Sequence, residues 1–190
     1  MRLFIALDID NSIAQKLDDY VRTLAPRFPG VRFVRSGNYH VTLKFLGEVR
    51  EVDAARAALR EVRESAVELH VGGVGFFPNA RAPRVFWAGI EAPDLPSLAS
   101  QIEERMAVLG YPRERDFHPH LTLARNGSGR PRPVRGERSS EAFAQLATYV
   151  ASSPKPEFGT MTGCEFFLYE SKLLAGGAEY RKIERYSLGG

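Results

Sequence analysis

Apolar residues recur along this chain in two spacings, one typical of helices and one typical of strands. Spacings of three and four predict amphipathic helices over residues 12–25, 52–62, 94–109 and 140–150. The first of these helices begins with Ser12 and Gln15, which together form a capping-box pattern. Each predicted helix has one apolar side that must be buried against another element.

The segments between these helices are rich in apolar, β-branched and aromatic residues, as strands are. We expect strands at Arg2–Leu7, Val31–Val34 and Tyr39–Leu46, near 67–77 and 84–91, after Pro119, and near 158–170 and 179–188, the last two joined by a turn at Ala175-Gly176-Gly177. Most of these strands are linked as hairpins, and the order of elements is roughly repeated in the second half of the chain. The pattern predicts an α+β fold with antiparallel sheets.

Composition places the chain among ordinary globular proteins. With 44% hydrophobic and 26% charged residues over 190 positions, it is long enough for one domain or for two small lobes that share a cleft. Its single cysteine, Cys164, excludes an internal disulfide and a multi-cysteine metal site. The apolar run Leu3–Leu7 is too short for a signal peptide or a membrane span, so we expect a cytoplasmic protein without a membrane partner.

Charge is mildly informative. Lys and Arg number 26 against 23 Asp and Glu, which gives a net charge of +3 and permits an anionic partner without requiring one. The arginines are concentrated in one segment, because residues 125–138 contain five arginines and one acidic residue. Gly and Pro are frequent there as well, so this segment is predicted to be an exposed loop.

The most informative feature is a tetrapeptide that occurs twice. His40-Val41-Thr42-Leu43 returns eighty positions later as His120-Leu121-Thr122-Leu123. On a strand, side chains two positions apart share one face, so each copy presents an imidazole beside a hydroxyl while its apolar residues point into a core. Two such strands facing each other would surround one small polar group with two imidazoles and two hydroxyls.

This set of side chains suits displacement at phosphorus. Histidine has an unperturbed pKa of about 6.5, so one ring can accept a proton while the other donates one. An attacking water must lose a proton as the leaving oxygen gains one, and hydroxyls can hold the non-bridging oxygens. No metal ion is needed when the leaving group is activated, as in a strained cyclic phosphate ester.

In their longer contexts, both motifs resemble those of a known family. The chain is similar to the 2H phosphoesterases, and among them to the RNA 2′,3′-cyclic phosphodiesterases of the LigT/ThpR type, which are also called 2′-5′ RNA ligases. The similar stretches are residues 40–49, residues 117–125, and residues 167–171 with the later Gly177 and Tyr180. The likeness extends from the first strand to the last.

The resemblance implies one domain over residues 1–190, with a two-lobed, pseudo-symmetric LigT-like fold whose antiparallel sheets line a central cleft with the helices outside. It also implies hydrolysis of a 2′,3′-cyclic phosphate to a 2′-phosphate by a monomer that needs neither a metal nor a cofactor. The implied partner is RNA with a 2′,3′-cyclic phosphate end, or a cyclic nucleotide. By similarity, His40 is the proton donor to the leaving O3′, His120 is the proton acceptor that activates water, and Thr42 and Thr122 bind phosphate oxygens.

Further substrate contacts are implied next to the motifs. Phe45 and Arg125 stand five positions after the two histidines and match family residues that enclose the terminal nucleobase. Strict alternation would put them on the face opposite the histidines, so this role requires that each strand ends, bulges or twists there. In the arginine-rich loop, Arg130 and Arg132 either belong to a solvated linker or guide an RNA strand toward the cleft.

Three alternatives stay open. The same site could join a 2′,3′-cyclic end to a 5′-hydroxyl, as a 2′-5′ RNA ligase acting on tRNA halves. The chain could instead be a non-catalytic module that binds RNA ends, although binding alone does not need two titratable groups. A metal site could be drawn from His118 with the two motif histidines, but the motifs offer no matching Asp or Glu, so we expect a structural role for His118.

Overall fold

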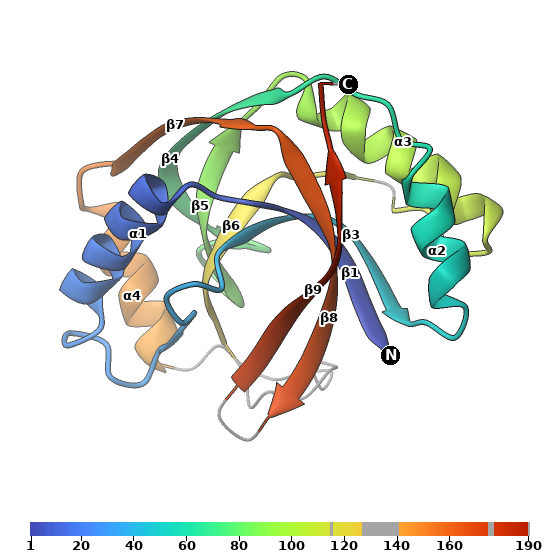
Figure 1. Cartoon of the computed structure of the whole chain (residues 1–190). Coiled ribbons are helices and arrows are strands. Elements are labelled where there is room, and N and C mark those ends of the chain that lie inside the picture. The colour runs from blue at the N-terminus through green and yellow to red at the C-terminus, as the bar shows by residue number, and fades with distance from the viewer. Residues whose placement is uncertain (115, 127–140, 175–176, 190) are drawn as a thin grey trace.

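The computed structural model describes residues 1–114, 116–126, 141–174 and 177–189. These residues form a strongly curled antiparallel sheet with helices on its two outer sides (Figure 1). The strands are β1 (Arg2–Asp8), β2 (Arg32–Phe33), β3 (His40–Glu48), β4 (Val67–Phe77), β5 (Val85–Glu91), β6 (His120–Arg125), β7 (Glu157–Gly163), β8 (Glu165–Leu174) and β9 (Gly177–Ser187), and the helices are α1 (Asn11–Leu24), α2 (Val52–Leu59), α3 (Leu95–Val108) and α4 (Glu141–Ala151). The predicted α+β class with antiparallel strands is confirmed.

The sheet consists of two halves of similar design. Its strand order is β7-β4-β5-β6-β3-β1-β8-β9, and the short β2 pairs with β6. The two halves meet where β3 and β6 pair, at Val41 and Leu121. The two strands that carry the repeated motif are therefore neighbours at the centre of the sheet.

The helices tie the two halves together. Helix α1 follows β1 and precedes β3, yet it packs against β7 in the other half, whereas α3 follows β5 and packs against β3. Figure 1 shows α1 and α4 on one side of the sheet and α2 and α3 on the other. The apolar sides of these helices enter one core, in which Leu17 of α1 and Ile102 of α3 are fully buried. None of the described helices is long and apolar enough to cross a membrane.

One predicted strand was wrong. The apolar stretch near 158–170 forms two strands, β7 and β8, which are separated at Cys164 and lie in opposite halves of the sheet. The backbone carbonyl of Cys164 accepts a hydrogen bond from the amide of Leu188 at the crossover. The division is made by strand pairing, so the local composition of the stretch did not reveal it.

The predicted capping box of the first helix was wrong, although the helix starts within one residue of the predicted position. Helix α1 begins at Asn11 after Asp10, and Ser12 lies within its first turn. The side chain of Gln15 donates to Asp19 one turn later instead of closing a capping box. The predicted turn at Ala175 and Gly176 and most of the arginine-rich loop lie outside the described residues.

Candidate active site

The first motif strand contains a β-bulge that decides which side chains share a face. In the register with β1, Thr42 lies opposite Ala6 but Lys44 lies opposite Ile5, so Leu43 is an extra residue. A bulge of this kind interrupts the alternation of a strand. Lys44 is consequently turned to the buried side, and Phe45 returns to the face of His40 with 53% of its surface exposed.

The second motif strand repeats this bulge. Thr122 lies opposite Trp87 and Ala124 lies opposite Phe86, so Leu123 is the extra residue. The burial pattern over residues 120–125 is the same as that over residues 40–45. Arg125 is thereby exposed on the face of His120, and the requirement that each strand bulges or twists before these two positions is met.

Lys44 does not share the face of His40 and Thr42, where strict alternation would place it. Its side chain is only 1% exposed, and its ammonium lies 2.7 and 2.8 Å from the two carboxylate oxygens of Glu103 on α3. It also donates to the carbonyl of Pro112 at 2.9 Å. Lys44 therefore holds α3 and the segment before His118 against β3.

The antiparallel pairing places the two motifs head to tail. With Val41 opposite Leu121, the flanking positions bring His40 toward Thr122 and His120 toward Thr42. Each motif therefore presents its imidazole beside the hydroxyl of the other copy. The four side chains proposed from the sequence lie on two adjacent strands around one local twofold axis.

Both imidazoles are held in the same way. The Nδ1 of His40 lies 2.8 Å from the carbonyl of Asn38, and the Nδ1 of His120 lies 2.7 Å from the carbonyl of His118. A carbonyl can only accept, so each Nδ1 carries a hydrogen and each Nε2 is left to exchange a proton. His118 thus supports the site through its backbone carbonyl, as the structural role expected for it requires.

Both histidines are neutral near pH 7 in the free protein. Burial lowers the pKa of His40 to about 4, and the positive charge of Arg125 and the nearby His120 act in the same direction, whereas the Asn38 carbonyl and Asp8 oppose the shift. Burial also lowers the pKa of His120; the hydrogen bond with the His118 carbonyl opposes this shift, and the charges of Arg125 and His118 add to it. An anion bound between the rings would favour their protonated forms.

Aromatic side chains surround His40. The ring of Phe4 on β1 lies 4.9 Å from the imidazole and 5.9 Å from the ring of Phe45. Tyr180 on β9 meets His40 edge-on at 5.1 Å. These rings form an apolar wall that leads from His40 to Phe45, which is a suitable surface for stacking a flat ligand.

A second aromatic group borders His120. The ring of Phe77 meets the imidazole edge-on at 5.0 Å and lies 5.3 Å from Trp87. The indole of Trp87 lies flat over Gly75, where a Cβ would come within 2.3 Å of the ring. Phe77 and Trp87 therefore wall the site, while the neighbouring Phe76 stacks on Phe86 within the core.

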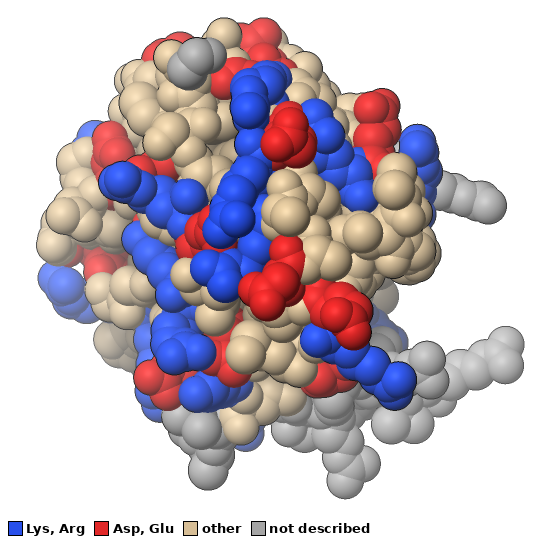
Figure 2. All heavy atoms as spheres, turned by 45° about the vertical axis from the view of Figure 1, so that its right-hand side comes forward, with Lys and Arg blue, Asp and Glu red and all other residues tan. Residues whose placement is uncertain are grey.

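The remaining predicted substrate residues are only partly described. Arg125 donates to the hydroxyl of Thr122 at 3.3 Å, and its charge is close enough to influence His40. Arg130 and Arg132 lie outside the described residues. Elsewhere many basic side chains are paired, because Arg56 and Arg60 both contact Glu184, and the basic band in Figure 2 has acidic side chains between its blue ones.

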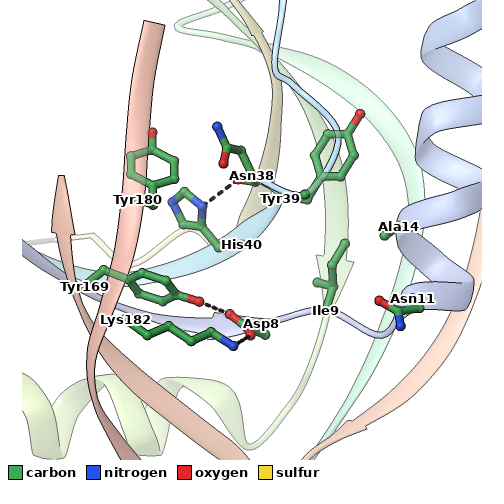
Figure 3. Close-up of a pocket in the computed structure, with 11 residues that line it drawn as sticks. Asp8, Ile9, Asn11, Ala14, Asn38, Tyr39, His40, Tyr169, Tyr180 and Lys182 are labelled. Carbon is green, nitrogen blue, oxygen red and sulfur yellow. Dashed lines mark hydrogen bonds and ion pairs between the residues drawn. The ribbon is translucent and has the colours of Figure 1, made fainter. Parts of the chain in front are cut away.

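A cavity of about 320 Å³ adjoins His40 (Figure 3). Asp8 lies in its wall, where it accepts a hydrogen bond from the Tyr169 hydroxyl and forms an ion pair with Lys182. None of Asp8, Tyr169 and Lys182 was assigned a role from the sequence. The alternation of Phe4, Ala6 and Asp8 along β1 was the available signal that Asp8 shares the face of the site.

Metal ligands do not gather among the described residues. Within those ranges, no group of three or more His, Cys, Asp or Glu side chains is placed to hold a metal ion. The ring of His118 is exposed and lies 6.3 Å from that of Phe77. The absence of a cofactor stays a prediction from the sequence.

Comparison with known proteins decides the family. The family model described as LigT-like phosphoesterase matches residues 7–87 and 90–159 of this chain. The chain belongs to the LigT-like phosphoesterases. A LigT-like relative from Archaeoglobus fulgidus, named RNA 2′,3′-cyclic phosphodiesterase, is 36% identical over 186 residues, covering 96% of this chain and 98% of that protein. A relative with the same name from Escherichia coli is 31% identical over 193 residues, covering 98% of this chain and 96% of that protein.

Solved LigT-like structures have the same fold. The crystal structure of E. coli LigT complexed with 3′-AMP superimposes with a TM-score of 0.78 at 28% identity, covering all of this chain and 98% of that one. The structure of TT0787 from Thermus thermophilus also gives a TM-score of 0.78, at 29% identity over all of this chain and 99% of that one. The LigT-like fold predicted from the sequence is confirmed.

Proposed function

We propose that this protein hydrolyses 2′,3′-cyclic phosphates on RNA ends or nucleotides to 2′-phosphates, without a metal ion. The observation that carries the proposal is the pairing of β3 with β6 at Val41 and Leu121, beside which two imidazoles and two hydroxyls lie on one face. The names of the relatives from A. fulgidus and E. coli support the same reaction.

In the proposed mechanism, the two histidines divide the proton transfers. The Nε2 of His120 takes a proton from water as the water oxygen attacks phosphorus, and the bond from phosphorus to O3′ breaks. The protonated Nε2 of His40 gives its proton to O3′, so that the products are a 2′-phosphate and a 3′-hydroxyl. Thr42 and Thr122 hold the non-bridging oxygens, on which negative charge accumulates in the transition state.

His40 must carry a proton before the reaction although its pKa in the free protein is about 4. The negative charge of the bound phosphate stabilises the protonated ring of His40 and so raises its pKa in the complex, because charges interact strongly where water is excluded. Each Nδ1 keeps its hydrogen throughout and donates it in a hydrogen bond to a backbone carbonyl. Proton exchange is thereby confined to the Nε2 atoms.

Substrate contacts complete the proposal. Phe45 and Arg125 enclose the terminal nucleobase, and the 3′-AMP in the E. coli LigT structure supports a nucleotide ligand for this fold. Arg130 and Arg132 guide the RNA strand, so their replacement by alanine is expected to raise KM for an RNA oligonucleotide and to spare a cyclic mononucleotide. The monomeric state and the cytoplasmic location stay predictions.

The reaction is tested with alanine variants of the two histidines. In the presence of a chelator, His40→Ala and His120→Ala are each expected to lower the rate of hydrolysis of a 2′,3′-cyclic nucleotide by about 10²–10⁴-fold, since acid–base groups contribute that much. His70→Ala is the matched control, because His70 lies on β4, where it pairs with Glu157.

Phosphorus NMR identifies the product as a 2′- or a 3′-phosphate. Wild-type rates in both histidine variants would rule out the mechanism. Binding of cyclic nucleotides without turnover would favour the RNA-end binding module. Ligation of tRNA halves, assayed beside hydrolysis, tests the reverse direction, which microscopic reversibility allows at the same site.

A further inference from the structure

The two halves of the site differ at one position. On the strand next to β3, Asp8 lies directly opposite His40, whereas on the strand next to β6, Gly89 lies directly opposite His120. Directly opposed residues of an antiparallel pair have Cβ atoms about 4.5–5.5 Å apart. In this otherwise symmetric arrangement, His40 therefore has a carboxylate side chain as its direct neighbour, whereas His120 lies opposite a glycine, which has no side chain.

The carboxylate of Asp8 is fixed in place from two sides. Tyr169 on β8 donates its hydroxyl to one oxygen, and the ammonium of Lys182 on β9 contacts the other (Figure 3). Burial, with Asp8 adding to it, raises the pKa of Tyr169, so this hydroxyl remains a donor. Lys182 is held in turn over the ring of Phe167, 4.0 Å from its centre. The carboxylate therefore stays in the wall of the cavity that His40 also lines.

Among the residues that the structure describes, an acidic side chain acts on His40 but not on His120, whereas Arg125 acts on both imidazoles. The titratable and charged groups around His40 are Asp8 on β1, Arg125 and His120 on β6, Tyr169 on β8, and Tyr180 and Lys182 on β9. The charges of Arg125 and His118 act on His120 and oppose its protonation, while the backbone carbonyl of His118 favours it, as that of Asn38 does for His40. Within the described residues, Asp8 is the acidic group that acts on His40, and His120 has no counterpart of it.

We propose that Asp8 is a positioning residue that assigns the proton-donor role to His40. The inference rests on the proposed function, because it concerns which of the two histidines is protonated in the substrate complex. To donate a proton, His40 must be an imidazolium that carries a hydrogen on both Nδ1 and Nε2. A fixed carboxylate beside the ring stabilises this charged form. Arg125 opposes a positive charge on both rings, but His120 has no carboxylate opposite it, so it stays neutral and accepts the proton of water. Lys182 limits the effect by compensating part of the Asp8 charge.

The test uses two substitutions with opposite expected effects. Asp8→Asn keeps the shape of the side chain and an oxygen for Tyr169 but removes the charge, whereas Lys182→Met removes the compensating cation. The alkaline limb of the pH profile of kcat, where the donor loses its proton, is expected to move down by about one unit in Asp8→Asn and up in Lys182→Met. The acid limb, which reports the acceptor, is expected to stay in place in both variants.

Lys172→Met is the matched control, because Lys172 pairs with Glu170 on β8 and not with Asp8. It removes the same charge from the neighbouring strand and is expected to leave both limbs unchanged. If Asp8→Asn is too slow to assay, NMR titration of the His40 ring in free Lys182→Met protein gives a second readout, with an expected rise of its pKa from about 4.

The inference is overturned if neither limb moves, if both variants move a limb in the same direction, or if the acid limb moves instead. In the last case His40 would be the acceptor. These failures are distinct from failure of the proposed function, which requires that His40→Ala and His120→Ala retain activity.

Discussion

The buried ion pair of Lys44 and Glu103 allows a sharp test of how the motif strand is held. All three N–H donors of the Lys44 ammonium are used, two by the Glu103 carboxylate and one by the Pro112 carbonyl. Glu103→Ala would leave a charge on a side chain that is 1% exposed. Removing one partner of a buried pair typically costs about 3–5 kcal/mol, a large part of the ~5–15 kcal/mol by which a domain is stable.

The assay is urea unfolding at neutral pH. With a slope of about 2 kcal/mol per molar urea, the midpoint of Glu103→Ala is expected about 2 M below that of the wild type. The double variant Lys44→Met, Glu103→Leu buries no charge, so it is expected to recover most of that loss. Asp19→Ala, which breaks the exposed pair with Arg22, is the control and is expected to cost less than about 1 kcal/mol.

The reasoning would be refuted if Glu103→Ala and Asp19→Ala lowered the free energy of unfolding by the same small amount. It would also be refuted if the double variant were as unstable as the single one. In that case the stability of β3 would not depend on satisfying the Lys44 charge.

Two further predictions concern His40 and Gly75, which lies beneath the ring of Trp87. Because the pKa of His40 falls from about 6.5 in the unfolded chain to about 4 in the folded one, the unfolded state binds its proton first, and up to about 3 kcal/mol of stability is lost as the pH falls from 6.5 to 4. His40→Gln is expected to flatten the urea stability profile over that range, and an unchanged slope would contradict the assigned shift. Gly75→Ala places a Cβ 2.3 Å from the ring of Trp87, so we expect a loss of about 1–3 kcal/mol. Since Trp87 is the single tryptophan, its fluorescence should shift as well, and unchanged emission and stability would show that the ring is not packed there.

Local patterns in the sequence were sufficient for most elements and for singling out the two motif strands. They failed where a contact with a distant segment decides the outcome. The bulges that bring Phe45 and Arg125 onto the face of the histidines are visible only in the register with β1 and β5. Strict alternation therefore gave Lys44 the wrong face.

The same reason explains the missed parts of the site. Asp8 belongs to the site because strand pairing places it opposite His40. Its partners Tyr169 and Lys182 are more than 150 residues away in the sequence. The division of the stretch near Cys164 into β7 and β8 is likewise imposed by the two different halves that these strands complete. Apart from the alternation that puts Asp8 on the face of Phe4 and Ala6, the spacing of apolar residues carries no sign of these features.

The exchange of helices between the halves of the sheet has a consequence for the integrity of the molecule. Helix α1 comes from the half that contains β1 and β3 but covers β7, and α3 comes from the half that contains β5 and β6 but covers β3. Each half is therefore covered in part by a helix from the other half, although α4 packs against β4 within its own half. Separating the halves along the β3–β6 pair beside the two histidines would therefore also uncover β7, which α1 covers, and β3, which α3 covers.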